Sequence, residues 1–289
     1  MAIFEVLLNG IMLGGMYGLI ALGLNLQFGV SRIMNLSYGE SFMAGALGAW
    51  FAISVWKFNP LLSWIITAPI AFGVNWLVYQ FLLLPLVRRA KSQHALDADI
   101  VLVTFGLFFV AQGFAISTLG GDLRGYSFLS EPLHVFTATI ALNRFVAFLG
   151  ACVLAIILFV VFRYTRLGMA LRAIIIDPIA AEIVGINVQR LSAIAFAAGG
   201  AMAVISGTLV STFISFSASI GVEYTLKALI VVILAGVGRI TGTLAAGLLL
   251  GVIEAVGGYV LDSSLTLAIN FAIFTIVLLW RPTGLFSRA

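Results

Sequence analysis

Charged residues are scarce in this sequence of 289 residues. Only 9% are Asp, Glu, Lys or Arg, whereas about 25% is usual for a soluble domain. One cysteine, Cys152, and two histidines are present, so the chain can form no internal disulfide and no Cys-rich metal site. The sequence also has no Gly-x-x-x-x-Gly-Lys-Ser/Thr motif, so any ATP that drives its function must bind another subunit. We expect no catalytic residue, metal site or cofactor in this chain.

Apolar residues dominate the chain instead. They make up 62% of it, and the mean hydropathy is +1.19. This much apolar surface cannot be hidden in one ordinary core, so most helices must be apolar on all sides and face lipid or each other. We therefore predict an all-α fold, with one polytopic transmembrane domain over residues 1–289. The net charge of +4 does not indicate nucleic-acid binding, because Lys and Arg fall in short segments between the apolar runs.

The apolar runs can be divided into membrane segments. A bilayer core of about 30 Å needs roughly 20 apolar residues per helix. Long runs cover residues 7–30, 36–56, 61–86, 98–118, 142–162, 190–212 and 264–280. Two shorter runs cover 225–238 and 243–260, and the first is short enough to be a discontinuous or re-entrant helix. The sequence thus predicts eight to ten membrane segments.

The basic residues are unevenly divided between the two sides of the membrane that this order implies. If all nine runs cross, one side collects eleven of the fifteen Lys and Arg residues, including those of segment 163–190 and the C-terminus. The other side collects Lys57, Arg124, Arg144 and Lys227. The positive-inside rule places the first group and the C-terminus in the cytoplasm. The N-terminus is then outside, unless a break in the first helix between residues 29 and 35 reverses it.

Two segments between the apolar runs are long enough to form structure outside the membrane. The first, about 120–142, contains Gly-Gly, a proline and charges of both signs, and we expect it to be the largest outer loop. The second, about 163–190, is the largest cytoplasmic element. Within it, Asp177 and Pro178 suit the cap and first position of a helix that stops at Gly185. We predict a short helix at the membrane surface there.

Glycines recur on single helix faces near both ends of the chain. Those spaced four apart are Gly10, Gly14 and Gly18, and then Gly247 and Gly251. Small residues at this spacing let two helix backbones approach closely. We interpret them as packing residues, although contacts that slide during gating would show the same pattern.

Two acidic residues, Glu40 and Glu254, fall within apolar sequence. A charge at bilayer depth costs about 2.5–3.5 kcal/mol on insertion scales, so it usually faces a partner or a wet path. Glu40 ends a polar stretch with Asn35, Tyr38 and Gly39, which fits unwound backbone lining a cavity. Alternatively, Glu40 begins the next helix, whose dipole favours a negative charge there. Glu254 is either a hydrogen-bonded strut or part of a proton relay.

Several stretches in combination resemble one family. They are residues 8–23 (Leu-Asn-Gly-Ile-Met-Leu-Gly-Gly-Met-Tyr-Gly-Leu-Ile-Ala-Leu-Gly), 33–40 (Ile-Met-Asn-Leu-Ser-Tyr-Gly-Glu), 163–187, 227–255 and 281–286 (Arg-Pro-Thr-Gly-Leu-Phe). Nearly from end to end, they resemble the permeases of branched-chain amino-acid ABC importers, the LivH-like branch. The resemblance implies a heterodimer with a second related permease in the bacterial cytoplasmic membrane. It also implies two cytoplasmic ATPases that bind ATP and Mg²⁺, an external solute-binding protein, and alternating access.

The resemblance assigns roles to particular residues as well. Residues 177–185 match the coupling segment, which docks in a groove of the ATPase in that family. The coupling residues are then Asp177, Pro178, Ala181, Glu182, Gly185 and Ile186. We expect the polar residues of the apolar runs and their ends to line or gate the pathway, namely Asn35, Tyr38, Gly39, Glu40, Arg239 and Glu254.

Two departures from the family pattern leave the solute open. Tyr38 stands where the family has His, and residues 238–242 read Gly-Arg-Ile-Thr-Gly where the family favours Gly-Ser-Ile-Pro-Gly. Relatives of similar sequence carry urea, short amides or aromatic acids, so these solutes are alternatives to leucine, isoleucine and valine. A different class is a self-sufficient secondary transporter or channel that uses Glu40 and Glu254 as proton or cation sites.

Overall fold

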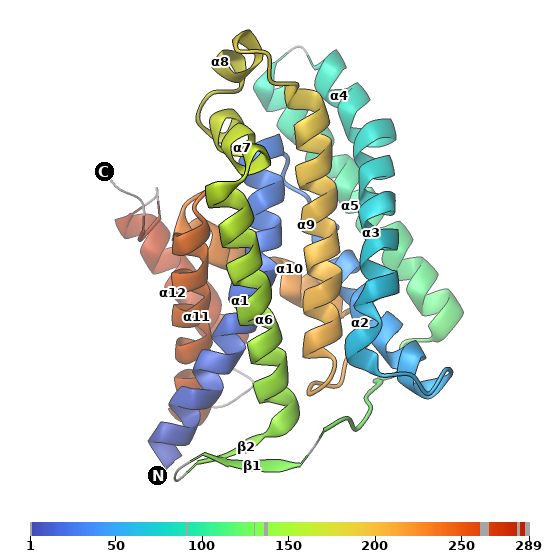
Figure 1. Ribbon diagram of the computed structural model, residues 1–289, viewed down its shortest axis with the longest axis vertical. Helices are drawn as coiled ribbons and strands as arrows, with labels where there is room; N and C mark the ends of the chain where they lie inside the picture. The colour runs from blue at the N-terminus through green and yellow to red at the C-terminus, as the bar shows by residue number, and fades with distance from the viewer. Residues whose placement is uncertain are drawn as a thin grey trace.

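Helix α1 (Ala2–Ser31) is the central helix of a bundle (Figure 1). The computed structural model describes residues 2–90, 92–129, 131–135, 138–260, 266–281 and 284–286. In it, every residue of α1 from Met16 to Gln27 is buried. A helix that is apolar on all sides is expected at such a position, because it has no face suited to water. Four helices surround α1: α6 (Leu142–Tyr164), α9 (Val188–Val210), α10 (Ile220–Ala235) and α11 (Ile240–Val260).

The remaining helices flank this core. Helix α2 (Tyr38–Ser54) packs on α9, and a 3-10 turn (Pro60–Leu62) leads from it into the next passage. That passage joins α3 (Trp64–Val78), a π-helical stretch (Tyr79–Leu83) and α4 (Leu84–Arg89). Helix α5 (Gln93–Leu119) returns along it. Two short helices follow α6, namely α7 (Arg166–Ile176) and α8 (Pro178–Ile183), and α12 (Thr266–Trp280) follows α11.

These helices confirm the predicted all-α polytopic fold. Nine passages through the bundle correspond in order to the nine predicted runs. Six of the described helices are long and apolar enough to cross a membrane. The other three passages, α2, α10 and α12, have 17, 16 and 15 residues, which is fewer than the roughly 20 that span a bilayer core. Short passages were expected at 225–238 and 243–260, but α11 is long enough to cross, and full crossings were expected at α2 and α12.

Helix α2 is short because the chain before it re-enters the bundle without helical structure. The chain leaves α1 at Ser31 and turns at Arg32, which has a φ of 54°. Residues 32–37 then descend beside α1, so that the Tyr38 hydroxyl donates a 2.7 Å hydrogen bond to the carbonyl oxygen of Ile20. Ile20 lies 11 residues before the end of α1, which is about 16 Å along the helix. Helix α2 therefore begins near the middle of the bundle, and the break follows a complete passage of α1.

The two ends of the bundle differ in structure (Figure 1). One end, which we call the α8 end, carries α7, α8 and the turn between α4 and α5. The described C-terminal residues also lie there, since Leu285 donates a backbone hydrogen bond to Leu234 at the end of α10. The opposite, N-terminal end carries a hairpin of β1 (Pro132–Val135) and β2 (Ala138–Ala141), paired antiparallel with Pro132 opposite Ala141. This hairpin lies in the predicted outer loop and is the reason the fold is not purely helical.

Helices α1 and α11 are in backbone contact along their glycine faces. A Cβ atom added at Gly251 would lie 2.2 Å from the backbone nitrogen of Gly14, and one at Gly247 would lie 2.5 Å from that of Gly18. A Cβ at Gly10 would lie 2.8 Å from the Cα of Val252. These distances are shorter than any van der Waals contact, so the two helices can approach this closely only where side chains are absent.

We expect Gly251→Ala to destabilise the protein by about 1–3 kcal/mol, the usual range for overpacking a tightly packed contact. The added methyl group meets backbone atoms of α1, which cannot turn aside. Gly113→Ala in α5 is the matched control, because nothing lies within 4 Å of its added Cβ and alanine favours helix over glycine. Thermal unfolding of both variants in detergent measures the difference in stability. Equal unfolding temperatures for Gly251→Ala and Gly113→Ala would show that α1 and α11 are not in backbone contact at Gly251.

Candidate functional site

The non-helical segment between α1 and α2 is held inside the bundle by hydrogen bonds of polar side chains. Asn35 donates to the side-chain oxygen of Gln27 at 3.3 Å, and Gln27 donates to the carbonyl oxygen of Phe196 at 2.6 Å. The Asn35 Oδ1 atom accepts from both the backbone and the hydroxyl of Ser37, at 3.0 and 2.8 Å. Irregular backbone at membrane depth is tolerated where protein covers it or a cavity adjoins it. Asn35 and Tyr38 thus fix the shape of the segment from within.

Glu40 stands where the first turns of two helices meet. It is the third residue of α2, and Gly39 before it donates from its backbone to the Thr225 hydroxyl of α10 at 2.8 Å. A Cβ at Gly39 would lie 1.8 Å from the carbonyl oxygen of Gly221, so only glycine allows α2 and α10 to approach here. The Glu40 side chain extends to Gly221, at the start of α10. Both helix dipoles therefore favour its negative charge.

The carboxylate of Glu40 is buried, and only 6% of the residue is exposed. Neither of its oxygens has a hydrogen-bond partner among the described residues. The expectation that Glu40 lies in the first turn of a helix is met, but the carboxylate caps no backbone N–H there. Glu40 also lines a cavity of about 520 Å³ between α2, α3 and α5.

Glu254 belongs to a buried ionic cluster. Its Oε1 atom lies 3.0 Å from the Nζ atom of Lys227 and accepts a hydrogen bond from the Tyr17 hydroxyl at 2.9 Å. Its Oε2 atom accepts from Asn270 at 3.0 Å. Lys227 also lies 2.8 Å from Glu223 and donates to the Tyr17 hydroxyl at 2.9 Å. Each side chain of the Lys227–Glu254 pair has several partners, which is the arrangement expected of a structural strut.

The placement of Lys227 corrects the sequence analysis, which counted this residue with the basic residues of the outer side although it stands within the predicted run 225–238. Lys227 lies inside α10 and is 4% exposed. The sequence did contain a sign that Lys227 belongs to a helix, because Glu223 stands four residues earlier on the same helix face. The cluster borders a cavity of about 400 Å³, which Arg144 and residues 214–217, 219 and 220 also line. The partner of Glu254 is thus a residue that sequence reasoning missed.

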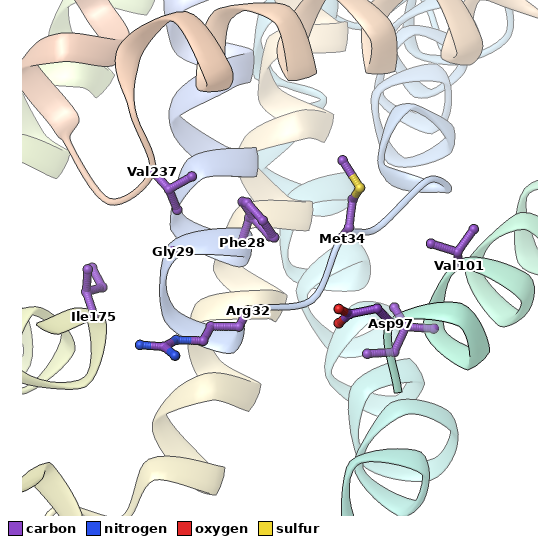
Figure 2. A pocket seen from close by; sticks show the side chains of 9 residues that line it. Phe28, Gly29, Arg32, Met34, Asp97, Val101, Ile175 and Val237 are labelled. Carbon is purple, nitrogen blue, oxygen red and sulfur yellow. The ribbon is translucent and has the colours of Figure 1, made fainter. Parts of the chain in front are cut away.

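A third cavity, of about 530 Å³, opens at the α8 end (Figure 2). Phe28 and Gly29 lie at the end of α1, Arg32 follows it, and Asp97 lies in the first turns of α5. Figure 2 shows the Arg32 side chain extended toward Ile175 of α7, with Asp97 on the other side of the cavity. Charges of both signs therefore stand at this mouth of the bundle.

Arg239, which we expected to gate the pathway, lies beside this mouth and does not line the cavity. Its guanidinium donates to the carbonyl oxygen of Phe286 at 2.5 Å, and its own carbonyl oxygen accepts from the Thr243 hydroxyl at 2.7 Å. Arg239 thus holds the C-terminal residues against the start of α11. Asn25 reinforces the same turn, because its side-chain oxygen accepts from the backbone of Gly238 at 2.7 Å.

Helices α7 and α8 are joined at Asp177 and lie outside the bundle. We call residues 166–185 the α7–α8 elbow. The Asp177 carboxylate accepts hydrogen bonds from the backbone N–H groups of Ile179 and Ala180, at 2.9 and 3.1 Å, and Pro178 occupies the first position of α8. Gly185 follows the helix with a φ of 86°, a conformation that favours glycine. The cap and the stop therefore lie where the sequence placed them.

The residues of the elbow face two directions. Ala181 is 2% exposed and packs with Leu26 and Ile174, and Ile186 packs against the same cluster. Glu182 faces away from the bundle. Four large aliphatic residues are more than 70% exposed on this outward side: Ile176, Ile179, Ile183 and Val184. Sequence reasoning missed these four, although apolar residues spaced three and four apart in a segment outside the membrane were a visible signal.

At the N-terminal end, two loops are joined across the bundle. Arg124 and Phe216 exchange backbone hydrogen bonds of 2.8 Å, and the Arg124 guanidinium lies 4.2 Å from the centre of the Trp50 ring. Tyr126 shares a 2.9 Å hydrogen bond with Ser211. Burial raises the pKa of the Tyr126 hydroxyl to about 12, so the group stays neutral and hydrogen-bonded near neutral pH. These contacts hold residues 120–126 against the loop between α9 and α10.

Comparisons with known proteins agree with this architecture. The family model for the branched-chain amino acid transport system permease component matches residues 6–278. The high-affinity branched-chain amino acid transport system permease protein LivH of Salmonella typhimurium is 30% identical, with 97% of this chain and 94% of LivH covered. The corresponding protein BraD of Pseudomonas aeruginosa is 27% identical, with 98% and 95% covered. Among solved structures, PsaBC of Streptococcus pneumoniae in complex with a Fab has a similar fold, with a TM-score of 0.52 and 13% identity over 95% of this chain and 91% of that one.

Proposed function

Because this chain belongs to the family of branched-chain amino acid transport system permease components, we propose that it forms part of the pathway by which an ATP-driven importer moves branched-chain amino acids. The observation that carries this proposal is the α7–α8 elbow, which stands outside the bundle and exposes four aliphatic side chains. Exposed apolar patches of this kind mark sites of protein interaction. The permease itself makes and breaks no covalent bond, and ATP and Mg²⁺ bind only its partners.

The elbow gives a route by which a cytoplasmic ATPase moves the membrane helices. Ile176, Ile179, Ile183 and Val184 enter a groove of the ATPase, and two ATPase subunits serve a heterodimer of this chain with a second related permease. Asp177 and Gly185 keep the elbow stiff, while the inward packing of Ala181 and Ile174 joins it to α1 and α9. Closure of the ATPases then shifts the ends of α6 and α9 and alternates access to the pathway.

The orientation follows from the same proposal. The α8 end faces the cytoplasm of a bacterial cell, as the excess of basic residues in its loops indicates, and the C-terminus lies on that side. The N-terminal end then faces outward. The loops joined there by Arg124 and Phe216 receive the solute-binding protein, which sets the solute that is delivered. Urea, short amides and aromatic acids are the alternative solutes to be compared with branched-chain amino acids.

Reconstitution in liposomes tests the proposed function. We expect the purified chain alone to show no uptake driven by a proton or sodium gradient. We expect the complex with its second permease, ATPases and binding protein to import radiolabelled leucine only when ATP is present inside. Exchange of the binding protein for one that binds another solute should change the imported solute. Gradient-driven uptake by the chain alone would contradict the importer and favour a secondary transporter that uses Glu40 and Glu254.

A further inference from the structure

The ionic cluster at Lys227 contains two carboxylates but only one ammonium. The ammonium of Lys227 lies 2.8 Å from Glu223 and 3.0 Å from Glu254. Its third hydrogen goes to the Tyr17 hydroxyl at 2.9 Å, so all three donors are used. Glu254 is satisfied in turn, because Tyr17 and Asn270 also donate to it and its side chain is only 12% exposed. The negative charge that the cluster leaves uncompensated therefore falls on Glu223.

Glu223 lines the cavity of about 400 Å³ beside the cluster, and its side chain is 50% exposed. Its Oε1 atom faces Lys227, whereas no described residue donates a hydrogen bond to its Oε2 atom. Arg144 lines the same cavity, but both ion pairs among the described residues belong to Lys227. Arg144 instead donates to the side-chain oxygen of Asn9 at 2.9 Å. A cation that enters the cavity thus finds a carboxylate oxygen that still lacks a donor.

The residues that line this cavity extend from the N-terminal end of the bundle to its middle. Arg144 is the third residue of α6 and stands at the outer level. Tyr17, which contacts Lys227 at the inner level, lies 14 residues before the end of α1, about 21 Å along a helix of 30 residues. A half-exposed charge at such a depth faces water or a polar occupant, because lipid does not solvate it. The cavity is therefore an aqueous entrance from the N-terminal end.

Two serine hydroxyls of the lining stand close to Glu223 in the chain. Ser219 is the N-cap residue of α10, four residues before Glu223, and its side chain caps no backbone N–H. Its hydroxyl shares a 2.9 Å hydrogen bond with the hydroxyl of Ser217. This bond uses one of the two hydroxyl hydrogens, so the other is left to donate to an acceptor in the cavity. Residues four apart at a helix start are neighbours, so a donor and a carboxylate stand side by side there.

An apolar side completes the cavity. Leu13, Ile214 and Ile220 are the aliphatic residues of the lining next to the polar groups. The volume of about 400 Å³ lies within the range of about 300–1,000 Å³ that is usual for small-molecule sites. An unpaired carboxylate oxygen, a hydroxyl donor and an aliphatic wall match the ammonium, the carboxylate and the side chain of an aliphatic amino acid.

We propose that this cavity is where the permease first binds its solute, a zwitterionic α-amino acid with an aliphatic side chain. Glu223 holds the α-ammonium, Ser219 donates to the α-carboxylate, and the aliphatic wall encloses the side chain. Lys227 is a positioning residue, because its ion pair fixes the Glu223 carboxylate at the inner end of the cavity. This inference rests on the proposed function and deepens it by naming the groups that receive the solute.

Thermal unfolding of the full chain in detergent, titrated at constant ionic strength with leucine and its two half-molecules, tests the proposal. 3-Methylbutylammonium has the amine and the chain of leucine, and 4-methylpentanoate has the carboxylate and the chain. A ligand of the folded state raises the unfolding temperature as its concentration grows. We expect leucine to do so most and the amine less, and we expect no effect of the acid, because the excess charge of the cluster is negative.

Two variants separate the two ends of the solute. In Glu223→Gln, which still accepts from Lys227, affinity for leucine and for the amine should fall about tenfold or more, the factor for losing a hydrogen bond to a charged group. In Ser219→Ala, affinity for leucine should fall about 3- to 10-fold while affinity for the amine is unchanged, a split that a merely structural role would not produce. Glu131→Gln, which removes an exposed carboxylate outside the cavity, should bind leucine like the wild type.

Several results would overturn the proposal. They are the absence of stabilisation by leucine, unchanged leucine binding by Glu223→Gln, and equal stabilisation by the amine and the acid. Stabilisation by potassium ions equal to that by leucine would identify a simple cation site, and stabilisation by phosphatidylethanolamine in place of leucine would identify a lipid site. Leucine import separates the two levels. If the complex with Glu223→Gln imports leucine like the wild type, only this inference fails; if the wild-type complex imports none, the proposed function fails.

Discussion

An aspartate in place of Ile183 is expected to separate this permease from its ATPase. Ile183 is 80% exposed on α8, and we propose that it enters an apolar groove of the ATPase together with Ile179. Buried interface anchors contribute about 2 kcal/mol or more each when truncated, which is a factor of roughly 30 in the dissociation constant. A carboxylate in the groove adds the cost of desolvating a charge. Co-purification with the ATPase and ATP-driven uptake should both be lost.

Folding controls make this result interpretable. Ile183 has few contacts within the chain, so Ile183→Asp should leave the unfolding temperature in detergent unchanged. Leu123→Asp is the matched control, because Leu123 is 77% exposed at the opposite end of the bundle and should leave ATPase binding intact. Replacing the inward-facing Ala181 is a poorer test, since a large side chain there disturbs the packing with Leu26. Retention of a stoichiometric ATPase by Ile183→Asp would show that α8 is not the coupling surface.

Breaking the ionic cluster in the bundle is expected to have the largest effect on stability. In Lys227→Met, the buried carboxylate of Glu254 loses its positive partner, while Tyr17 and Asn270 still donate to it. Removing one partner of a buried pair typically costs about 3–5 kcal/mol, because the other charge is left uncompensated. Lys57→Met, which changes an exposed lysine of a loop, should alter the free energy of unfolding by less than about 0.5 kcal/mol.

The double variant Lys227→Met with Glu254→Gln distinguishes the two roles that the sequence left open for Glu254. If the pair is a strut, removing both charges should recover much of the stability that Lys227→Met loses, and ATP-driven uptake should return with it. If Glu254 is instead part of a proton relay, uptake should stay lost while stability recovers. Unfolding temperature and uptake in the same preparations give both readings. If Lys227→Met alone were as stable as the wild type, the pair would not be a structural strut.

Sequence patterns were sufficient where the information is local. Nine apolar runs predicted the nine passages because each run needs only its own composition to choose lipid over water. The ends of α8 followed from the chemistry of Asp177, Pro178 and Gly185, since capping acts within one turn. The glycines of α1 and α11 indicated close packing because their spacing of four residues is itself a geometric property of a helix face.

Contacts between distant segments were not readable in the same way. Lys227 was counted with the outer side because its charge was judged without knowledge of Glu254, 27 residues later, or of Tyr17, 210 residues earlier. The depth at which α2 begins depends on the hydrogen bond of Tyr38 to α1, and no local pattern encodes it. The outward face of α8 was missed because the exposed side depends on how Ala181 packs against α1 and α9.

The sequence by itself determined that this protein lies in a membrane, the order of its apolar passages, the cap and stop of α8, and the family that its motifs resemble. These properties follow from composition, periodicity and capping, which act over a few turns of chain. Only the tertiary structure decided which charges are paired, which face of the elbow is exposed, and that the Glu40 carboxylate is buried without a hydrogen-bond partner among the described residues. Whether a residue is buried, and which residue it pairs with, depends on two or more segments together. Those segments meet only when the helices have packed.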